Sequence, residues 1–126
     1  MSKKVILTQE APEPIGPYSQ AVQFGNMLFC SGQIAIDPKT GQVSTGDVKT
    51  QTVQVMKNIE AVLKEADMKF ENIIKTTIFL TSMNDFAAVN EVYGQHFKSQ
   101  APARSTVAVA GLPKGVQVEI EVIAHR

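Results

Sequence analysis

The sequence has one cysteine and only two histidines, and this scarcity excludes several kinds of site. A lone Cys30 cannot form an internal disulfide, so the fold is not a disulfide framework. Cys30 lies in the apolar run Met27–Cys30, which favours a buried and unreactive thiol. With only His96 and His125 to accompany it, no metal-ligand spacing can be assembled. We therefore expect no metal site.

Long apolar runs and an excess of charge of one sign are also absent. Twelve basic and twelve acidic residues cancel, and the longest basic run is Lys3-Lys4, which argues against a nucleic-acid-binding surface. The apolar stretch Val5–Leu7 is too short for the core of a signal peptide, and no segment approaches the length of a membrane span. We expect a cytoplasmic protein without nucleic-acid or membrane partners.

The composition that remains is that of an ordinary globular chain. The 126 residues are 44% hydrophobic and 19% charged, which indicates one folded domain over residues 1–126 with a core large enough to need no covalent staples. No repeat, low-complexity tract or linker divides the chain.

Alternating or β-branched segments bounded by turn residues predict six strands. These are Lys3–Leu7, Ser19–Phe24, Met27–Ser31, Ile73–Thr81, Ser105–Ala110 and Gln117–Ala124. Gly25-Asn26 makes a tight turn between the second and third strands, and residues 111–115 form a five-residue turn before the last strand. The three prolines of residues 11–17 predict an irregular loop.

Two segments carry the periodicity of helices. Asp47 can cap a helix that runs to about Ala66, with apolar residues on one stripe. Ser82, followed three residues later by Asp85, resembles a capping box that opens a second helix to about Phe97. Its expected buried face is formed by Phe86, Val89, Tyr93 and Phe97. Two helices with one apolar stripe each can cover one face of a sheet.

The periodicity of the last two strands indicates what the other face of the sheet carries. Val118 and its alternate neighbours share one face of the last strand, and Glu119 lies on the opposite face. If Val107 also faces the helices, Arg104 points away from them, as Glu119 does. That face is then either exposed to solvent or covered by another copy of the chain.

Arg104 and Glu119 are the first candidates for chemistry. A guanidinium at the mouth of a small, apolar strand can hold the carboxylate of a small acid through two parallel hydrogen bonds. On residue type alone, a structural ion pair with Glu119 or Glu121 is the more common role for such an arginine. Glu119 can position a water or relay a proton, although most glutamates on strands are only solvated.

Two other places, Asn90 and Ser31-Gly32, break a local rule, and Tyr18 is a further candidate. Asn90 falls on the expected buried stripe, so its amide needs a partner, either backbone or ligand. Ser31-Gly32 ends a strand, and Gly32 permits either a bulge or the close approach of a backbone or ligand. Tyr18 places a phenol at a loop–strand junction, where packing at a rim is the commoner role.

Five motifs occur together in one order. They are "IGPYSQAV" (residues 15–22), "SGQI" (31–34), "VNEVY" (89–93), "PARS" (102–105) and "VEIEVIA" (118–124). Over nearly its whole length the chain resembles the RidA/YjgF family of enamine/imine deaminases. The resemblance implies an α/β (α+β), chorismate-mutase-like fold with one mixed six-stranded sheet and two helices on one face. It also implies a homotrimer around a central barrel, with ligand clefts between subunits.

The resemblance further implies hydrolysis of 2-iminobutanoate and 2-iminopropanoate to 2-oxo acids and ammonia, without a cofactor. Arg104 is then expected to clamp the substrate carboxylate, and Glu119 to hold the hydrolytic water and assist proton transfer. The expected substrate-binding residues are Tyr18, Ser31, Gly32, Asn90, Arg104 and Thr106. Thr106 departs from the family pattern, because many members carry cysteine there.

An alternative of a different class is a regulatory protein that binds a small 2-oxo acid in the same cleft without turning it over. Arg104 alone would suffice for binding a carboxylate, so the presence of both Arg104 and Glu119 favours the enzyme. RNA cleavage, which has been assigned to members of the family, is disfavoured by the zero net charge.

Overall fold

The computed structural model describes residues 2–126. Its strands are β1 (Lys4–Ile6), β2 (Ala21–Phe24), β3 (Met27–Gln33), β4 (Ile73–Leu80), β5 (Ala103–Ala108) and β6 (Val118–His125). Its helices are α1 (Val48–Glu65) and α2 (Phe86–Gly94), with short 3-10 turns η1 (Phe70–Asn72), η2 (Met83–Asp85) and η3 (Pro113–Gly115). Within this part of the chain, no helix is long and apolar enough to cross a bilayer.

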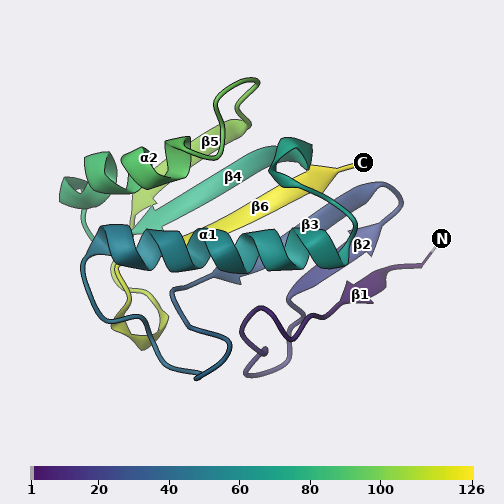
Figure 1. Ribbon diagram of the computed structural model, residues 1–126, viewed down its shortest axis with the longest axis horizontal. Helices are drawn as coiled ribbons and strands as arrows, with labels where there is room; N and C mark the ends of the chain where they lie inside the picture. The colour runs from purple at the N-terminus through teal and green to yellow at the C-terminus, as the bar shows by residue number, and fades with distance from the viewer. Residues whose placement is uncertain (1) are drawn as a thin grey trace.

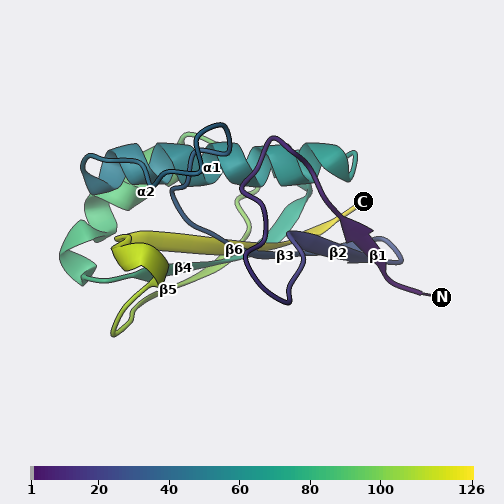
Figure 2. The ribbon, with the colours of Figure 1, turned by 90° about the horizontal axis from the view of Figure 1, so that it is seen from below.

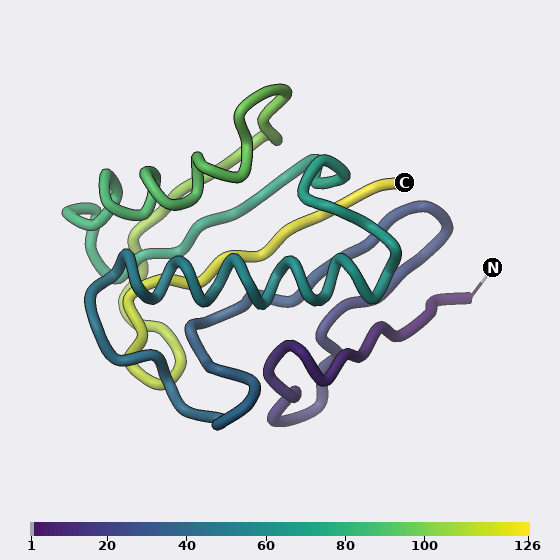
Figure 3. The backbone as a smooth tube through the Cα atoms, in the orientation of Figure 1, coloured from purple at the N-terminus to yellow at the C-terminus, as the bar shows by residue number. Residues whose placement is uncertain are grey.

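All six strands join one sheet in the order β1-β2-β3-β6-β4-β5 (Figure 1). β4 and β5 run parallel, and the other neighbours are antiparallel. The predicted mixed, six-stranded sheet is therefore confirmed. The last strand in sequence, β6, is inserted between β3 and β4, where it contacts both central strands, and the chain's two ends emerge on the same side of the molecule (Figure 3).

Both helices lie on the same face of the sheet, as Figure 2 shows edge-on. The alternate residues of β6 that were predicted to face the helices, from Val118 to Ala124, are almost completely buried. From α1, Val55, Ile59, Val62 and Leu63 complete the core with exposures of 1% or less. The hydrophobic core therefore lies between α1 and the central strands.

The first helix begins and ends where its sequence predicts. Asp47 accepts a hydrogen bond from Thr50 N at 2.9 Å, which satisfies one of the free N–H groups of the first turn. The same contact lowers the pKa of the Asp47 carboxyl, with the Thr50 hydroxyl and Lys49 contributing in the same direction. Ala66 closes the helix as its C-cap.

The second helix is shorter than predicted. Ser82 does cap, accepting a hydrogen bond from Asn84 N at 3.1 Å, but the turn it opens is the 3-10 turn η2. Asp85 makes no capping hydrogen bond, and α2 ends at Gly94 rather than near Phe97. Phe97 still packs against the core, because its ring lies 4.7 Å from that of Tyr93.

The prediction that Arg104 points away from the helices is wrong. β5 pairs with β4 in the register Thr76↔Arg104, and Thr76 is buried under α2, where its hydroxyl lies 2.8 Å from the Tyr93 hydroxyl. Arg104 therefore shares the helix-covered face, whereas Val107 is on the other face and 42% exposed. The alternation within β5 was correct, but its small residues do not indicate which side is buried.

The face of the sheet without helices carries several exposed apolar side chains. Phe29 of β3 is 48% exposed, Phe24 of β2 is 49% exposed and Val5 of β1 is 55% exposed. Phe29 pairs in register with Ile123 of β6, on the same strand face as Glu119 and Glu121. This face is thus apolar over β1, β2 and β3 and acidic along β6.

Candidate active site

The predicted site residues fall into two groups on opposite faces of the sheet. Arg104 is paired with Thr76 of β4, and Glu119 is paired with Phe79, three positions further along the same strand. Since successive side chains of a strand alternate between faces, Arg104 and Glu119 point to opposite sides. β4 also lies between β5 and β6, so the structural pairing of Arg104 with Glu119 or Glu121 does not occur within one chain.

The first group is built around Arg104. Its Nη1 donates a hydrogen bond of 2.6 Å to Asn90 Oδ1, and its guanidinium carbon lies 5.1 Å from the ring centre of Tyr93 and 5.5 Å from that of Phe86. These contacts hold a planar cation over two aromatic rings. Within residues 2–126 the only ion pair is Lys49–Glu91, so the Arg104 guanidinium has no carboxylate partner there.

Asn90 does not occupy the position expected from the sequence. Its side chain is exposed rather than part of the buried stripe, and its partner is the Arg104 side chain rather than backbone. Both residues line an open cavity of about 420 Å³ together with Tyr93 and Phe97. Burial raises the pKa of the Tyr93 hydroxyl, which the Thr76 hydroxyl and the Arg104 charge partly offset. The Tyr93 phenol that lines this cavity is therefore uncharged at neutral pH.

Thr106 lies on the same strand face as Arg104, two residues further along β5, and pairs in register with buried Ile78. Its hydroxyl oxygen is inaccessible to solvent and has no hydrogen-bond partner in the described part of the chain. Burying a hydroxyl without a hydrogen-bond partner costs free energy, which is why such atoms are few in folded proteins. The Thr106 hydroxyl is one of these exceptions. It does not line the cavity of Arg104.

The second group surrounds Glu119. Tyr18, Ser31, Gly32 and Glu119 all line one cavity of about 640 Å³ on the side of the sheet opposite Arg104. The structure therefore brings together four of the predicted residues here and leaves Arg104 and Asn90 in the other cavity.

Gly32 allows Glu119 to reach its position. A Cβ atom on Gly32 would lie 2.0 Å from Glu119 Oε2 and 2.8 Å from its Cδ, distances that no side chain tolerates. The pairing of β3 with β6 is shifted between Cys30 and Gln33, as expected of a bulge, and Gly32 lies inside that shift. Of the two alternatives left open for Gly32, the strand irregularity is present, and the group that approaches the glycine closely is the Glu119 side chain rather than a backbone.

The surroundings of Glu119 favour its protonated form more than water does. Partial burial raises the pKa of the Glu119 carboxyl, and the nearby carboxylate of Glu121 raises it further. Glu13 and Lys114 also line this cavity, so its charged groups are three acids and one lysine. A carboxyl with a raised pKa in a cavity is suited to exchange a proton with a bound molecule.

Tyr18 and Ser31 line the same cavity. Tyr18 is 53% exposed, and its hydroxyl accepts a hydrogen bond from Ile15 N at 3.3 Å. The Ser31 hydroxyl donates to Ser19 O at 2.6 Å, and Ser31 N donates to Gln20 O at 2.9 Å. Ser31 is therefore already bonded, whereas the Tyr18 phenol keeps its proton free for a ligand.

Sequence reasoning missed several residues of these cavities. Phe86 was expected only as core, yet its ring lies under the guanidinium of Arg104. Lys114 lies in the turn before β6 with a left-handed backbone (φ 57°) and lines the Glu119 cavity. Gln20 is 1% exposed and lines it too. No local signal in the sequence distinguishes a buried glutamine just before a strand from a solvated one.

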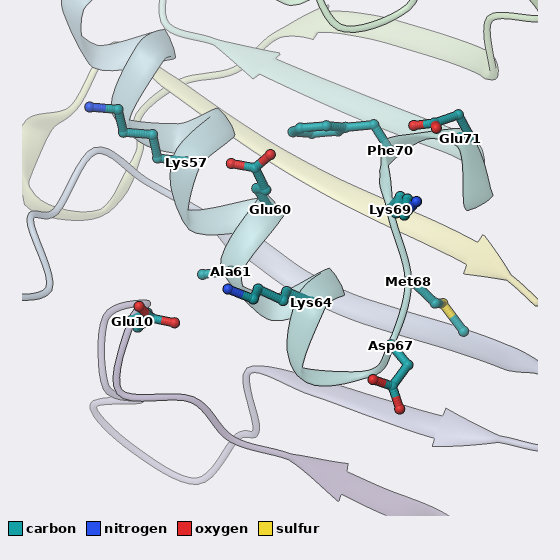
Figure 4. A pocket seen from close by; sticks show the side chains of 10 residues that line it. All are labelled: Glu10, Lys57, Glu60, Ala61, Lys64, Asp67, Met68, Lys69, Phe70 and Glu71. Carbon is teal, nitrogen blue, oxygen red and sulfur yellow. The ribbon is translucent and has the colours of Figure 1, made fainter.

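A larger cavity of about 860 Å³ lies apart from both groups (Figure 4). It is bordered by Lys57, Glu60 and Lys64 of α1 and by the segment from Asp67 to Glu71. It contains none of the predicted site residues. Within residues 2–126, no cluster of three or more His, Cys, Asp or Glu side chains could hold a metal ion.

The fold and the two cavities define an α+β protein in which one cavity contains an arginine without a carboxylate partner in the described residues and the other contains a partly buried glutamate with a raised pKa. The profile of the family described as Endoribonuclease L-PSP matches residues 8–126. The chain is 48% identical over 122 residues to the 2-iminobutanoate/2-iminopropanoate deaminase of Mus musculus, covering 97% of this chain and 90% of that protein. It is 50% identical over 122 residues to the putative regulator AldR of Lactococcus lactis, covering 97% of each.

Solved structures of similar sequence have the same fold as this chain. E. coli TdcF with bound serine superposes with a TM-score of 0.93 at 48% identity, covering 98% of each chain. RidA from an Antarctic Psychrobacter superposes with a TM-score of 0.94 at 41% identity, covering 98% of this chain and 99% of that one. The chain belongs to the RidA/YjgF/L-PSP family, as its five motifs predicted.

Proposed function

We propose that this protein is a hydrolytic deaminase that converts small 2-imino acids, such as 2-iminobutanoate and 2-iminopropanoate, to 2-oxo acids and ammonia. The observation that carries the proposal is the Arg104 guanidinium, which is oriented by Asn90 and two aromatic rings but has no carboxylate partner within residues 2–126. An arginine held in this way is ready to bind a carboxylate through two hydrogen bonds.

The proposed reaction needs a water and one group that exchanges protons. Water adds to the electrophilic C2 of the protonated imine, forming the new C–O bond, and gives a proton to the Glu119 carboxylate. Glu119 then returns this proton to the nitrogen of the carbinolamine. As the C–N bond breaks, ammonia leaves with the bonding pair, and the hydroxyl gives its proton to the Glu119 carboxylate as the C=O bond of the 2-oxo acid forms. Glu119 then passes this proton to the released ammonia, which restores its carboxylate. The raised pKa of Glu119 suits both steps.

The two cavities can act on one molecule only if different copies of the chain supply them. We propose the homotrimer implied by the family resemblance, with Arg104 of one subunit facing Glu119 of the next. Exposed Phe24 and Phe29 on the face without helices support burial against another copy. Three copies of the 13.7 kDa chain give about 41 kDa, so light scattering that reports a monomer would contradict the shared site.

A binding protein without catalysis is the second candidate, because one relative at 50% identity is named a putative regulator. Bound serine in the TdcF structure supports a site for small amino-acid-like molecules under either proposal. RNA cleavage, which the family description suggests, is not supported, because the net charge is zero and no basic stripe lines either cavity.

The test generates 2-iminobutanoate in place from threonine with a dehydratase and follows release of 2-oxobutanoate and ammonia. We expect the wild-type protein to accelerate release and Arg104→Ala to lose this effect. Lys49→Ala is the matched control, because it removes an exposed cation from α1 outside both cavities. Equal rates for wild type and Arg104→Ala would refute the proposed site. An inactive wild type that binds 2-oxobutanoate would favour the regulator.

A further inference from the structure

The amide of Gln20 makes more hydrogen bonds than any other side chain that lines the Glu119 cavity. Its Oε1 accepts from Thr8 N at 2.7 Å. Its Nε2 lies 3.0 Å from Thr8 O, 2.9 Å from Pro12 O and 3.3 Å from Ala11 O, so both of its protons have acceptors. The side chain is 1% exposed. A buried amide in this position ties the N-terminal segment to the start of β2.

The backbone of Gln20 bonds to a second residue that lines the same cavity, Ser31. Its carbonyl accepts from Ser31 N at 2.9 Å, and the carbonyl of the preceding Ser19 accepts from the Ser31 hydroxyl. Pro12 and Ser31 both line the cavity. Gln20 therefore bonds to two residues from different segments, Pro12 and Ser31, that line the same cavity as Glu119.

The segment between Glu10 and Tyr18 has few other means of holding its place. Pro12, Pro14 and Pro17 have no backbone N–H to donate. Among the described residues, the backbone–backbone hydrogen bonds of this segment are limited to Tyr18 N to Gly16 O. Burial of Ala11 and the amide of Gln20 are what attach it to the sheet.

We infer that Gln20 is a positioning residue of this site: its amide fixes the proline-rich wall over Glu119 and so sets where Tyr18 meets the ligand. The inference rests on the proposed function. The Gln20 side chain bonds to Thr8, Ala11 and Pro12 and to neither Arg104 nor Glu119, so its loss should weaken ligand binding more than the chemical step. An amide at position 20 supplies one acceptor and two donors. A carboxylate there would face the carbonyl oxygens of Thr8, Ala11 and Pro12 without a proton to donate.

The experiment compares Gln20→Glu and Gln20→Met with the control Gln9→Glu, which adds the same charge at an exposed position just before this segment. At about pH 8 we expect both Gln20 variants to raise the KM for 2-iminobutanoate and the Kd for 2-oxobutanoate about tenfold, with kcat within about twofold. At about pH 5 the buried carboxyl of Gln20→Glu becomes protonated and regains one donor. Its Kd, taken relative to wild type, should then recover, while that of Gln20→Met should not.

A second measurement needs no variant. If the amide and the ligand hold the same wall, saturating 2-oxobutanoate should slow hydrogen exchange of the Thr8 amide in the wild-type protein, because the coupling between two sites is reciprocal. This keeps the inference testable even if both substitutions prevent folding.

Two results would overturn the inference. The first is a tenfold faster Thr8 exchange in Gln20→Met with an unchanged Kd and KM, which would make Gln20 an anchor of the fold only. The second is unchanged Thr8 exchange when the wild type is saturated with 2-oxobutanoate. A wild type without deaminase activity would refute the proposed function instead, and the Kd comparison would still decide the role of Gln20.

Discussion

The substitution Gly32→Ala tests whether the position of Glu119 matters for activity. The added Cβ would lie 2.0 Å from Glu119 Oε2, 2.8 Å from Cδ and 3.0 Å from Cγ. Ordinary contacts begin near 3.4 Å, so the carboxylate must move by more than about 1 Å. The side chain moves rather than the strands, because a glutamate rotates about its χ angles at a small free-energy cost.

A displacement of this size has a large effect on catalysis and a small one on stability. A misplacement of about 1 Å in a reacting group costs on the order of 100-fold in rate. We therefore expect kcat/KM for 2-iminobutanoate to fall about 100-fold, which corresponds to about 2.7 kcal/mol of transition-state free energy. The Gly32 backbone is not left-handed, so alanine adds no backbone strain and the midpoint of thermal unfolding should change by only a few degrees, about as for a typical surface substitution.

The assay is the coupled release of 2-oxobutanoate, with Gly111→Ala as the matched control because a Cβ there meets no atom within 4 Å. Glu119→Asp supplies an internal check: the shorter side chain withdraws the carboxylate from position 32. Gly32→Ala should therefore cost much less in the Glu119→Asp background than in the wild type. Wild-type activity in a folded Gly32→Ala protein would refute the reasoning.

Three further predictions follow from the two cavities and the core. Arg104→Lys keeps the charge but loses the planar fork and the stacking on Tyr93, so we expect KM to rise about tenfold in the steady-state assay, with the loss not recovered by added salt. The pKa of Glu119 is raised in the folded state, so ionising this carboxyl destabilises the fold. The destabilisation is absent below the ordinary pKa of glutamate and complete above the raised pKa of Glu119. Urea unfolding at a series of pH values should accordingly show Glu119→Gln more stable than wild type near neutrality, with the difference vanishing in acid. Burial raises the pKa of Cys30 to about 12, so a thiol reagent at neutral pH should modify the unfolded but not the native protein.

The strands and α1 could be predicted because each has a local signal. Asp47 has a capping oxygen and an apolar stripe behind it, and β6 alternates between buried and exposed residues over its full length. The second helix was predicted too long because the apolar Phe97 continues its periodicity, although the backbone leaves the helix after Gly94. Packing of an aromatic ring against a core does not require helical backbone.

The face of β5 could not be predicted from the sequence. Apart from Arg104, its residues from Ala103 to Ala108 are small or β-branched, and all except Thr106 are classed as exposed. Periodicity therefore predicts the alternation of the side chains but not which set faces the helices. Direction depends on the parallel pairing with β4, which brings together segments about 30 residues apart in the chain. The same limit hid Gln20, whose partners lie 8 to 12 residues earlier in an irregular loop.

The separation of Arg104 from Glu119 leads to a test that does not depend on measuring oligomer size. Arg104→Ala and Glu119→Gln should each be inactive alone, because every site between two copies lacks one of the two groups. If the two proteins are unfolded together and refolded as mixed trimers, some sites receive Glu119 from an Arg104→Ala chain and Arg104 from a Glu119→Gln chain.

Random mixing in equal amounts makes each site intact with a probability of one half for each group, so activity should return to about one quarter of the wild-type value. The control mixes each variant with itself through the same refolding and should stay inactive. A site contained in one chain predicts no recovery at any mixing ratio. If mass spectrometry shows that the trimers are mixed and no activity returns, a site shared between Arg104 and Glu119 of different copies is excluded. The sheet of a single chain holds these two side chains on opposite faces, so Arg104 and Glu119 would then not act together on one molecule.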